Sequence, residues 1–271
     1  MRTTIGRVLI ALLLLGPAVF GLAHQATAAQ PTPRPTATPP PLEPRALDIL
    51  KASSARLAAA KSMSFAALEI FEQPSRQGHP LASSTQYQVT LVRPDKLRII
   101  MPGDGSPREY YYDGKTVTGY FPTENLAAVS PAPATIDTML EAAYKLSGTY
   151  FPFTDVIVTD PYTDLSPGLK LAYYVGQSKV VGGTTTDVVA YVAFGVFEQV
   201  WIGADDKLPR LVRAVYLNDP AQLRHELAFS DWQIDPVVGA DAFSSGAAAN
   251  AKRIPFKHPW PGPTPAPKKN S

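Results

Sequence analysis

The chain has 271 residues, with 25 Lys and Arg, 23 Asp and Glu, 28 Pro and no Cys. The lack of cysteine excludes a disulfide framework, and the near balance of charge lacks the basic excess typical of nucleic-acid binding. The sequence therefore predicts no nucleic-acid partner, and the chain is long enough to form one domain with a sizeable core.

The first 28 residues have the pattern of an export signal. Arg2 and Arg7 precede an apolar stretch that begins at Val8, and Ala26-Thr27-Ala28 offers the small residues that a signal peptidase recognises. We predict a signal peptide over residues 1–28 and an exported protein, periplasmic or extracellular, with no permanent membrane anchor after cleavage. The alternative is an anchor that is kept, but Pro17 interrupts the stretch, which is shorter than the roughly 20 residues a bilayer span needs.

Two proline-rich segments flank the rest of the chain. Residues 31–44 read PTPRPTATPPPLEP, and the C-terminal segment combines prolines with lysines. Neither composition suits a helix or a strand. We predict a disordered linker over 29–44, a folded domain over 45–256 and a disordered proline-rich and basic tail over 257–271.

Two segments have helical periodicity. Residues 45–62 are rich in good helix formers, and an apolar stripe runs along one side. In the second segment, 135–147, Thr135 predicts an N-cap and Gly148 predicts the end of the helix. Its apolar stripe consists of Ile136, Met139, Leu140, Ala143 and Tyr144.

An aromatic hairpin is predicted over residues 108–122, which read REYYYDGKTVTGYFP. A type I′ turn at Asp113-Gly114, with positive φ at both positions, would place Tyr112 opposite Lys115. The more apolar face, which we place on the inner side of the sheet, then carries Arg108, Tyr110, Tyr112, Val117, Gly119 and Phe121.

The remaining periodic segments alternate as strands and are joined by short turns. Such strands precede the second helix and fill most of the chain after Lys170. Because the helices are grouped rather than alternating with strands, the pattern predicts an α+β fold with an antiparallel sheet.

Several spaced pieces resemble an exported bacterial family, domain-of-unknown-function family 2092, within the LolA/LolB-like fold of lipoprotein carriers. The pieces are VRPDKLRI, YYDGKTVTGY, TIDTML, YVGQSKVVG, EQVWI, LPRLV and FSDW, between Val92 and Trp232. The resemblance implies a strongly curved antiparallel sheet, or half-barrel, whose concave face is covered by the N-terminal and central helices around an apolar cavity. It supplies no known ligand.

A cavity of this kind would be lined by the inner face of the sheet and by the stripe of the central helix, which we expect to act as a lid. Tyr, Phe and Met suit an acyl or isoprenoid-like ligand, because Met repacks easily and Tyr offers a hydroxyl. The alternative is that these residues form an ordinary core. The candidate residues are Tyr87, Val89, Tyr110, Tyr112, Val117, Phe121, Ile136, Met139, Leu140, Ala143 and Tyr144.

Residues with catalytic potential are few. His79, His225 and His258 lie far apart in the chain beyond the signal segment, and no hydrolase or phosphate-binding motif occurs. We expect His225 to be a strand residue with a satisfied partner. Asp155, Asp160 and Asp164 lack the spacing of a known calcium loop, so the sequence predicts no metal site, cofactor or catalytic residue.

Three classes of function remain. The first is a carrier, sensor or chaperone for an apolar small molecule, a lipid or a lipid-modified protein. The second is a scaffold that binds another envelope protein without catalysis, and the third is an unrecognised hydrolase. An elongated cavity favours the first class, a filled core with an exposed apolar patch favours the second, and a His-carboxylate-Ser cluster in a cleft favours the third.

Overall fold

The computed structural model describes residues 41–103 and 105–257. The predicted signal peptide, the linker up to residue 40 and the tail from residue 258 lie outside this part. Among the described residues, none of the helices has the length and apolar character needed to cross a membrane.

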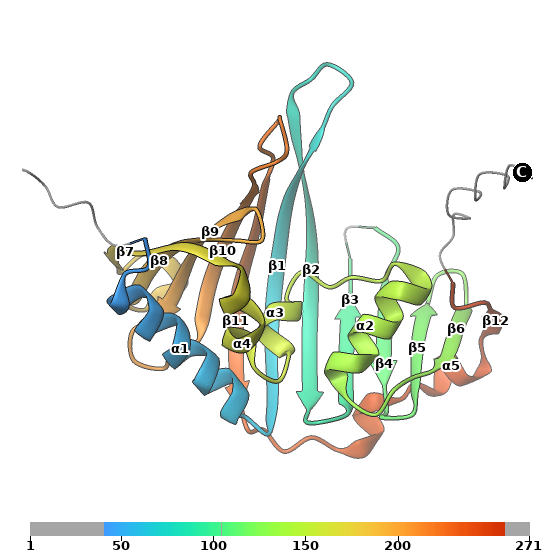
Figure 1. Cartoon of the computed structure of the whole chain (residues 1–271). Helices are drawn as coiled ribbons and strands as arrows, with labels where there is room; N and C mark the ends of the chain where they lie inside the picture. The colour runs from blue at the N-terminus through green and yellow to red at the C-terminus, as the bar shows by residue number, and fades with distance from the viewer. Residues whose placement is uncertain (1–40, 104, 258–271) are drawn as a thin grey trace, which may run out of the picture. The chain divides into compact units, whose positions relative to one another are not determined.

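One open sheet organises the fold (Figure 1). Its strands follow the order β12-β6-β5-β4-β3-β2-β1-β11-β10-β9-β8-β7, and the pairing is antiparallel except between β12 and β6. The expected α+β class with a mostly antiparallel sheet is confirmed. The strands are β1 (Ser62–Pro74), β2 (Pro80–Val92), β3 (Lys96–Met101), β4 (Arg108–Tyr112), β5 (Thr116–Phe121), β6 (Leu126–Pro131), β7 (Leu169–Ser178), β8 (Thr186–Ala193), β9 (Val196–Gly203), β10 (Pro209–Tyr216), β11 (Arg224–Ile234) and β12 (Lys252–Ile254).

Helices cover one face of this sheet, which we call the inner face. Figure 1 shows α1 in front of the half that contains β8 to β10, and α2 in front of β3 to β5. The short helix α5 packs on the opposite face, where Ala248 forms a small cluster with Tyr120 and Ala127. The helices are α1 (Pro44–Ala59), α2 (Ile136–Ser147), α3 (Thr154–Ile157), α4 (Pro161–Leu165) and α5 (Gly246–Asn250), with 3-10 turns η1 (Ser166–Gly168), η2 (Val181–Gly183) and η3 (Ala240–Phe243).

The end of the proline-rich linker belongs to the fold. We placed residues 29–44 in a disordered segment, but the backbone N–H of Glu43 donates to the carbonyl of Ala172 in β7 at 2.8 Å, and Leu42 forms a parallel bridge with Ala172. The Glu43 carboxylate also accepts a hydrogen bond from the N–H of Tyr174 at 2.8 Å. These bonds satisfy part of the open edge of β7, which otherwise presents unpaired backbone groups.

The aromatic hairpin forms with a different turn from the one expected. Tyr112 pairs with Val117 and Tyr110 with Gly119, so the register differs by two residues. Of the two turn residues, only Gly114 has positive φ, at 87°, because the Asp113 carboxylate accepts hydrogen bonds from the N–H groups of Lys115 and Thr116 at 2.9 and 2.7 Å. The prediction of a type I′ turn is therefore wrong. A shift of two residues leaves every side chain on its predicted face.

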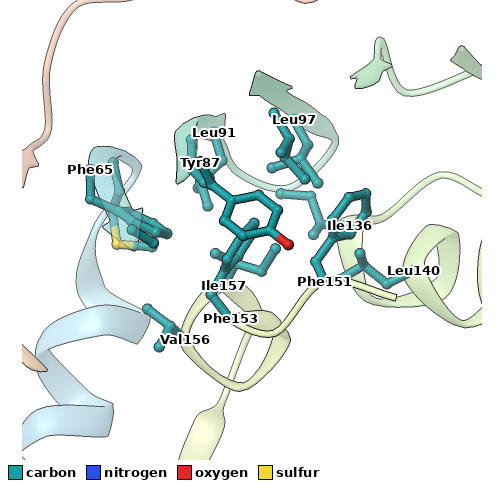
Figure 2. Close-up of a cluster of buried hydrophobic side chains, with 14 of the residues drawn as sticks. Phe65, Tyr87, Leu91, Leu97, Ile136, Leu140, Phe151, Phe153, Val156 and Ile157 are labelled. Carbon is teal, nitrogen blue, oxygen red and sulfur yellow. The ribbon is translucent and has the colours of Figure 1, made fainter. Parts of the chain in front are cut away.

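The main core lies between the inner face of β1 to β5 and the chain from α2 to α3 (Figure 2). Phe151 and Phe153, in the segment that follows α2, point into this core and stack with centroids 5.8 Å apart. Phe153 also meets Phe65 and Tyr87 edge-on, at 5.7 and 5.2 Å. A second cluster packs beneath α1, where Ala46 and Leu50 meet β7, β8 and β9.

Candidate functional site

The space beneath α2 is filled. A residual cavity of about 10 Å³ is all that remains there, because Phe151 occupies the gap between helix and sheet, beside Tyr110 at 5.1 Å (Figure 2). Of the candidate residues on α2, Tyr144 is 60% exposed and lies outside the core. The others are buried in the core: Ile136, Met139, Leu140 and Ala143.

The candidate residues on the strands divide into two groups. Val89, Tyr112 and Val117 are buried core residues, and the Tyr112 hydroxyl donates to the carbonyl of Pro133. Burial raises the pKa of Tyr112 to about 12. The second group, Tyr87, Tyr110 and Phe121, lines an open cavity beside α2. Tyr110 also lines the small cavity beneath α2, and Tyr87 is also buried in the core.

This cavity, which we call the inner groove, has a volume of about 880 Å³. It runs across the inner face of β1, β2, β4 and β5, between the chain that follows α2 and the C-terminal segment after β12. Its apolar walls include Phe71, Met101, Phe121, Phe151, Leu223, Ile254 and Phe256, and its polar walls include Glu69, Tyr87, Arg108, Tyr150, Tyr216 and His225.

A buried carboxylate organises the polar part of the inner groove. One oxygen of Glu69 accepts a hydrogen bond from the Tyr87 hydroxyl at 2.6 Å, and the other lies 2.6 Å from Nε2 of His225. Burial, and then the Glu69 carboxylate, raise the pKa of Tyr87 well above its ordinary value. The network holds three polar side chains in fixed positions at the groove wall.

His225 thus has the satisfied partner that we expected, although neither nearby acid in the sequence supplies it. Glu226 lies 3.6 Å from Arg213, and Asp231 accepts from Ser230 at 2.9 Å. His225 reaches Glu69 because β1 pairs with β11, with Phe71 opposite His225. Glu69 and His225 are 156 residues apart in the chain, and no local sequence pattern indicates that they meet.

A second cavity, which we call the acidic cavity, has a volume of about 310 Å³ and lies between the inner face of β8 to β11 and the helices α1, α3 and α4. It meets the inner groove at three residues that line both, Tyr150, Tyr216 and His225. Its walls also carry the carboxylates of Asp155, Asp164 and Glu198. The sequence grouped Asp155 and Asp164 with Asp160, but no sequence pattern linked Glu198 to them.

Burial raises the pKa of all three carboxyls, including that of Asp164. For Asp155 the surrounding protein is the main cause and the charge of Asp164 adds to it. Glu198 is also raised mainly by burial, although the Tyr191 hydroxyl donates to its carboxylate at 2.5 Å and so favours the charged form. Both groups therefore bear a cost when they are ionised in the absence of a positive partner.

The serine needed for a hydrolase is not aligned with His225. Ser147 lines the inner groove, but its hydroxyl donates to the carbonyl of Ala143 at 2.8 Å and lies 2.7 Å from the Thr149 hydroxyl. The hydroxyl that reaches the Glu69–His225 pair belongs to Tyr87. Among residues 41–103 and 105–257, no group of three or more His, Cys, Asp or Glu residues is arranged to hold a metal ion.

Residues 46–257 match the family described as "Predicted periplasmic protein (DUF2092)". The match spans most of the chain, so the protein belongs to this family. No curated protein matches it.

The chain is also similar to several solved structures. In the Pseudomonas aeruginosa MucA/MucB complex the identity is 16%, the match covers 75% of this chain and 62% of that one, and the TM-score is 0.42. For a LolA superfamily protein from Nitrosomonas europaea, the identity is 9%, the match covers 74% of this chain and 97% of that one, and the TM-score is 0.35. For a putative outer membrane lipoprotein-sorting protein domain from Vibrio parahaemolyticus, the identity is 15%, the match covers 73% of this chain and 96% of that one, and the TM-score is 0.33. At these scores, the likenesses do not identify a ligand or partner.

Proposed function

We propose that this protein is an exported, periplasmic binding protein that holds an apolar ligand in the inner groove. The ligand would be a lipid, or the acyl chain of a lipid-modified protein, and the protein would act as its carrier, sensor or chaperone. The family description as a predicted periplasmic protein supports the location.

The observation that carries the proposal is the size and lining of the groove. Its volume of about 880 Å³ falls within the range of small-molecule pockets, roughly 300–1,000 Å³. Four phenylalanine rings, together with Met101, Leu223 and Ile254, contribute to its apolar walls. Walls of this kind favour the removal of an acyl chain from water, at about 0.8 kcal/mol for each buried CH₂ group.

The site differs from the one that the sequence suggested. We expected the ligand between the sheet and α2, but that space is occupied by Phe151. In the proposal the ligand lies beside α2, against the C-terminal segment that carries Ile254 and Phe256. No movement of α2 is needed for it to bind.

Binding of a dansyl-labelled fatty acid to the exported protein tests this proposal. Replacing Phe121 by Ser removes an aromatic wall of the groove, and we expect the probe to bind at least about fivefold more weakly, a loss of about 1 kcal/mol. The matched control is Val129→Ser, because Val129 lies on the other face of the neighbouring strand β6 and does not line the groove.

Native mass spectrometry of the protein purified without detergent is the second measurement, and we expect a co-purified lipid. If the wild type does not bind the probe, or if Phe121→Ser binds as well as Val129→Ser, the groove is not an acyl site. A protein-binding scaffold would then explain the fold better.

A further inference from the structure

The acidic cavity has the size and walls of a separate ligand site. Its volume of about 310 Å³ lies at the lower end of the range for small-molecule pockets. Most of its lining is aliphatic or aromatic and comes from four strands and three helices, including Leu50, Leu165, Val200, Val212 and Phe229. An apolar body of moderate length therefore has a surface against which to pack.

Aromatic rings surround this cavity. Tyr150, Tyr162, Tyr191 and Tyr216 all line it. Tyr150 and Tyr216 stand where the cavity meets the inner groove and are 57% and 50% exposed, so ring surface is available there. The faces of such rings attract cations, by about 0.5–1 kcal/mol at exposed sites and about 2 kcal/mol where water is excluded.

The charges in the lining have one sign. Asp155, Asp164 and Glu198 contribute carboxylates, and no lysine or arginine lines the cavity. His225 is the one basic side chain in the lining, and its Nε2 is engaged by Glu69 at 2.6 Å. A positively charged ligand would therefore meet three acids and, among the described lining residues, no lysine or arginine. The ammonium of Lys51 lies 5.5 Å from the ring centroid of Tyr162, so the other tyrosine rings are the ones open to a ligand cation.

Asp155 is an exposed carboxylate in this lining, so a ligand in the cavity can reach it. Among the described residues, its side chain makes no hydrogen bond or ion pair, whereas Glu198 accepts from Tyr191. Asp155 keeps accessible surface where it lines the cavity, while surrounding protein raises the pKa of its carboxyl. A cation that reaches this carboxylate would offset the cost that the surrounding protein adds to its charged form.

From this geometry we infer that the acidic cavity is a binding site for a cationic molecule with an apolar body, such as an alkyl amine or alkyl quaternary ammonium compound. Its charged group would lie between Asp155, Glu198 and the tyrosine rings, and its apolar part would pack along β8 to β11. The site is distinct from the acyl site proposed above, and neither depends on the other.

Isothermal titration calorimetry with octyltrimethylammonium, below its micelle concentration, tests the inference. Octanoate and octan-1-ol serve as anionic and neutral ligands of similar length. We expect the ammonium compound to bind at least about tenfold more tightly than either, equivalent to about 1.4 kcal/mol or more. Equal or tighter binding of octanoate would overturn the inference.

Two variants locate the site. Asp155→Asn should weaken binding of the ammonium compound by about tenfold or more, while Asp205→Asn, an equal change of charge in the exposed turn after β9, should stay within about twofold of the wild type. Glu198→Gln should also weaken binding. If that variant fails to fold because Tyr191 loses its partner, Asp155→Asn still tests the site, since the Asp155 side chain makes no hydrogen bond or ion pair with residues 41–103 or 105–257.

A crossed experiment separates the two sites. Phe121→Ser should weaken binding of the fatty-acid probe and leave the affinity for the ammonium compound within about twofold of the wild type. Asp155→Asn should weaken binding of the ammonium compound and leave the affinity for the fatty-acid probe within about twofold. The cationic site is refuted if Asp155→Asn binds octyltrimethylammonium like the wild type with its circular dichroism unchanged. Loss of fatty-acid binding alone would refute only the function proposed for the inner groove.

Discussion

At the scale of single residues, the contrast between Glu69 and Asp155 separates a structural carboxylate from a functional one. Glu69 is buried, and each of its oxygens has a partner, Tyr87 or His225. Asp155 lies in a cavity with no partner among the described residues and with a raised pKa. Glu69 follows the rule that buried polar groups are paired, whereas Asp155 is exposed and has a perturbed pKa, which is typical of a functional site.

A stability measurement follows from this contrast. We expect Asp155→Asn to raise the melting temperature of the ligand-free protein near pH 7. Because the pKa of Asp155 is raised in the folded protein, its ionisation penalises the folded state more than the unfolded chain. The gain should be fully present above the folded-state pKa, shrink as the pH falls, and vanish by about pH 3, below the ordinary Asp pKa of about 3.9.

Differential scanning calorimetry of the two proteins between pH 3 and pH 7 provides the comparison (about one pH unit per step suffices). The other groups that face Asp155 in the cavity, Asp164, Glu198, Tyr150 and His225, are present in both proteins, so their titration largely cancels. Asp205→Asn should show no comparable gain. Destabilisation of Asp155→Asn at pH 7 would mean that the carboxylate already has a stabilising partner.

At the scale of elements, we propose that α2 is a core helix rather than a lid. Met139 is 2% exposed in the main core, whereas Tyr144, on the same predicted stripe, is 60% exposed. We expect Met139→Ala to cost about 2–5 kcal/mol in the free energy of unfolding, because it leaves a cavity beneath the helix. Tyr144→Ala should change it by no more than about 0.5 kcal/mol. Urea unfolding followed by circular dichroism measures both, and a small effect of Met139→Ala would restore the lid.

The same elements show what local sequence signals can predict. The N-cap at Thr135 and the end at Gly148 are confirmed: Thr135 Oγ1 accepts from the N–H of Thr138 at 3.2 Å, and Gly148 has φ of 71°. Both features depend on residues within one helical turn. The stripe of α2 was predicted less well, because periodicity gives the apolar side but not where the buried area stops. Tyr144 lies beyond that limit.

The hairpin shows the same division. Its faces were predicted because side chains alternate with a period of two, which a shift of two residues preserves. Its turn was not predicted, because the Asp113 carboxylate binds the following backbone N–H groups and moves the turn by one residue, to Gly114-Lys115. Asp competes for backbone groups in this way, and the pair Asp-Gly alone does not reveal it.

At the scale of the whole molecule, the candidate sites depend on contacts that the sequence does not signal. The inner groove joins β1 and β2 to the turn before β11 and to the segment after β12, and the acidic cavity joins α1 to α3, α4 and β8 to β11. Composition predicted the aromatic surface and the resemblance predicted a cavity. The position of Phe151, which fills the expected site, could not be predicted from the sequence, because it depends on the path of the chain after α2.

The continuous sheet also predicts how the described part of the chain unfolds. Pairing of β1 with β11 joins two groups of strands, and Val212 packs against both core clusters. We expect these clusters to unfold together rather than as two units. Trp201, on β9, reports one group of strands. Trp232→Phe and Trp260→Phe remove the other two tryptophan signals, because Trp232 packs against the main core and Trp260 lies outside the described residues. Ile99→Ala on β3 should cost about 2–5 kcal/mol in the free energy of unfolding, because Ile99 is fully buried in the other group.

If unfolding is concerted, this variant shifts the fluorescence midpoint and the far-UV circular dichroism midpoint in urea by the same amount. A shift seen by circular dichroism alone would show that β7 to β11 unfold independently of β2 to β6, and that the two proposed sites lie on separately stable parts of the sheet.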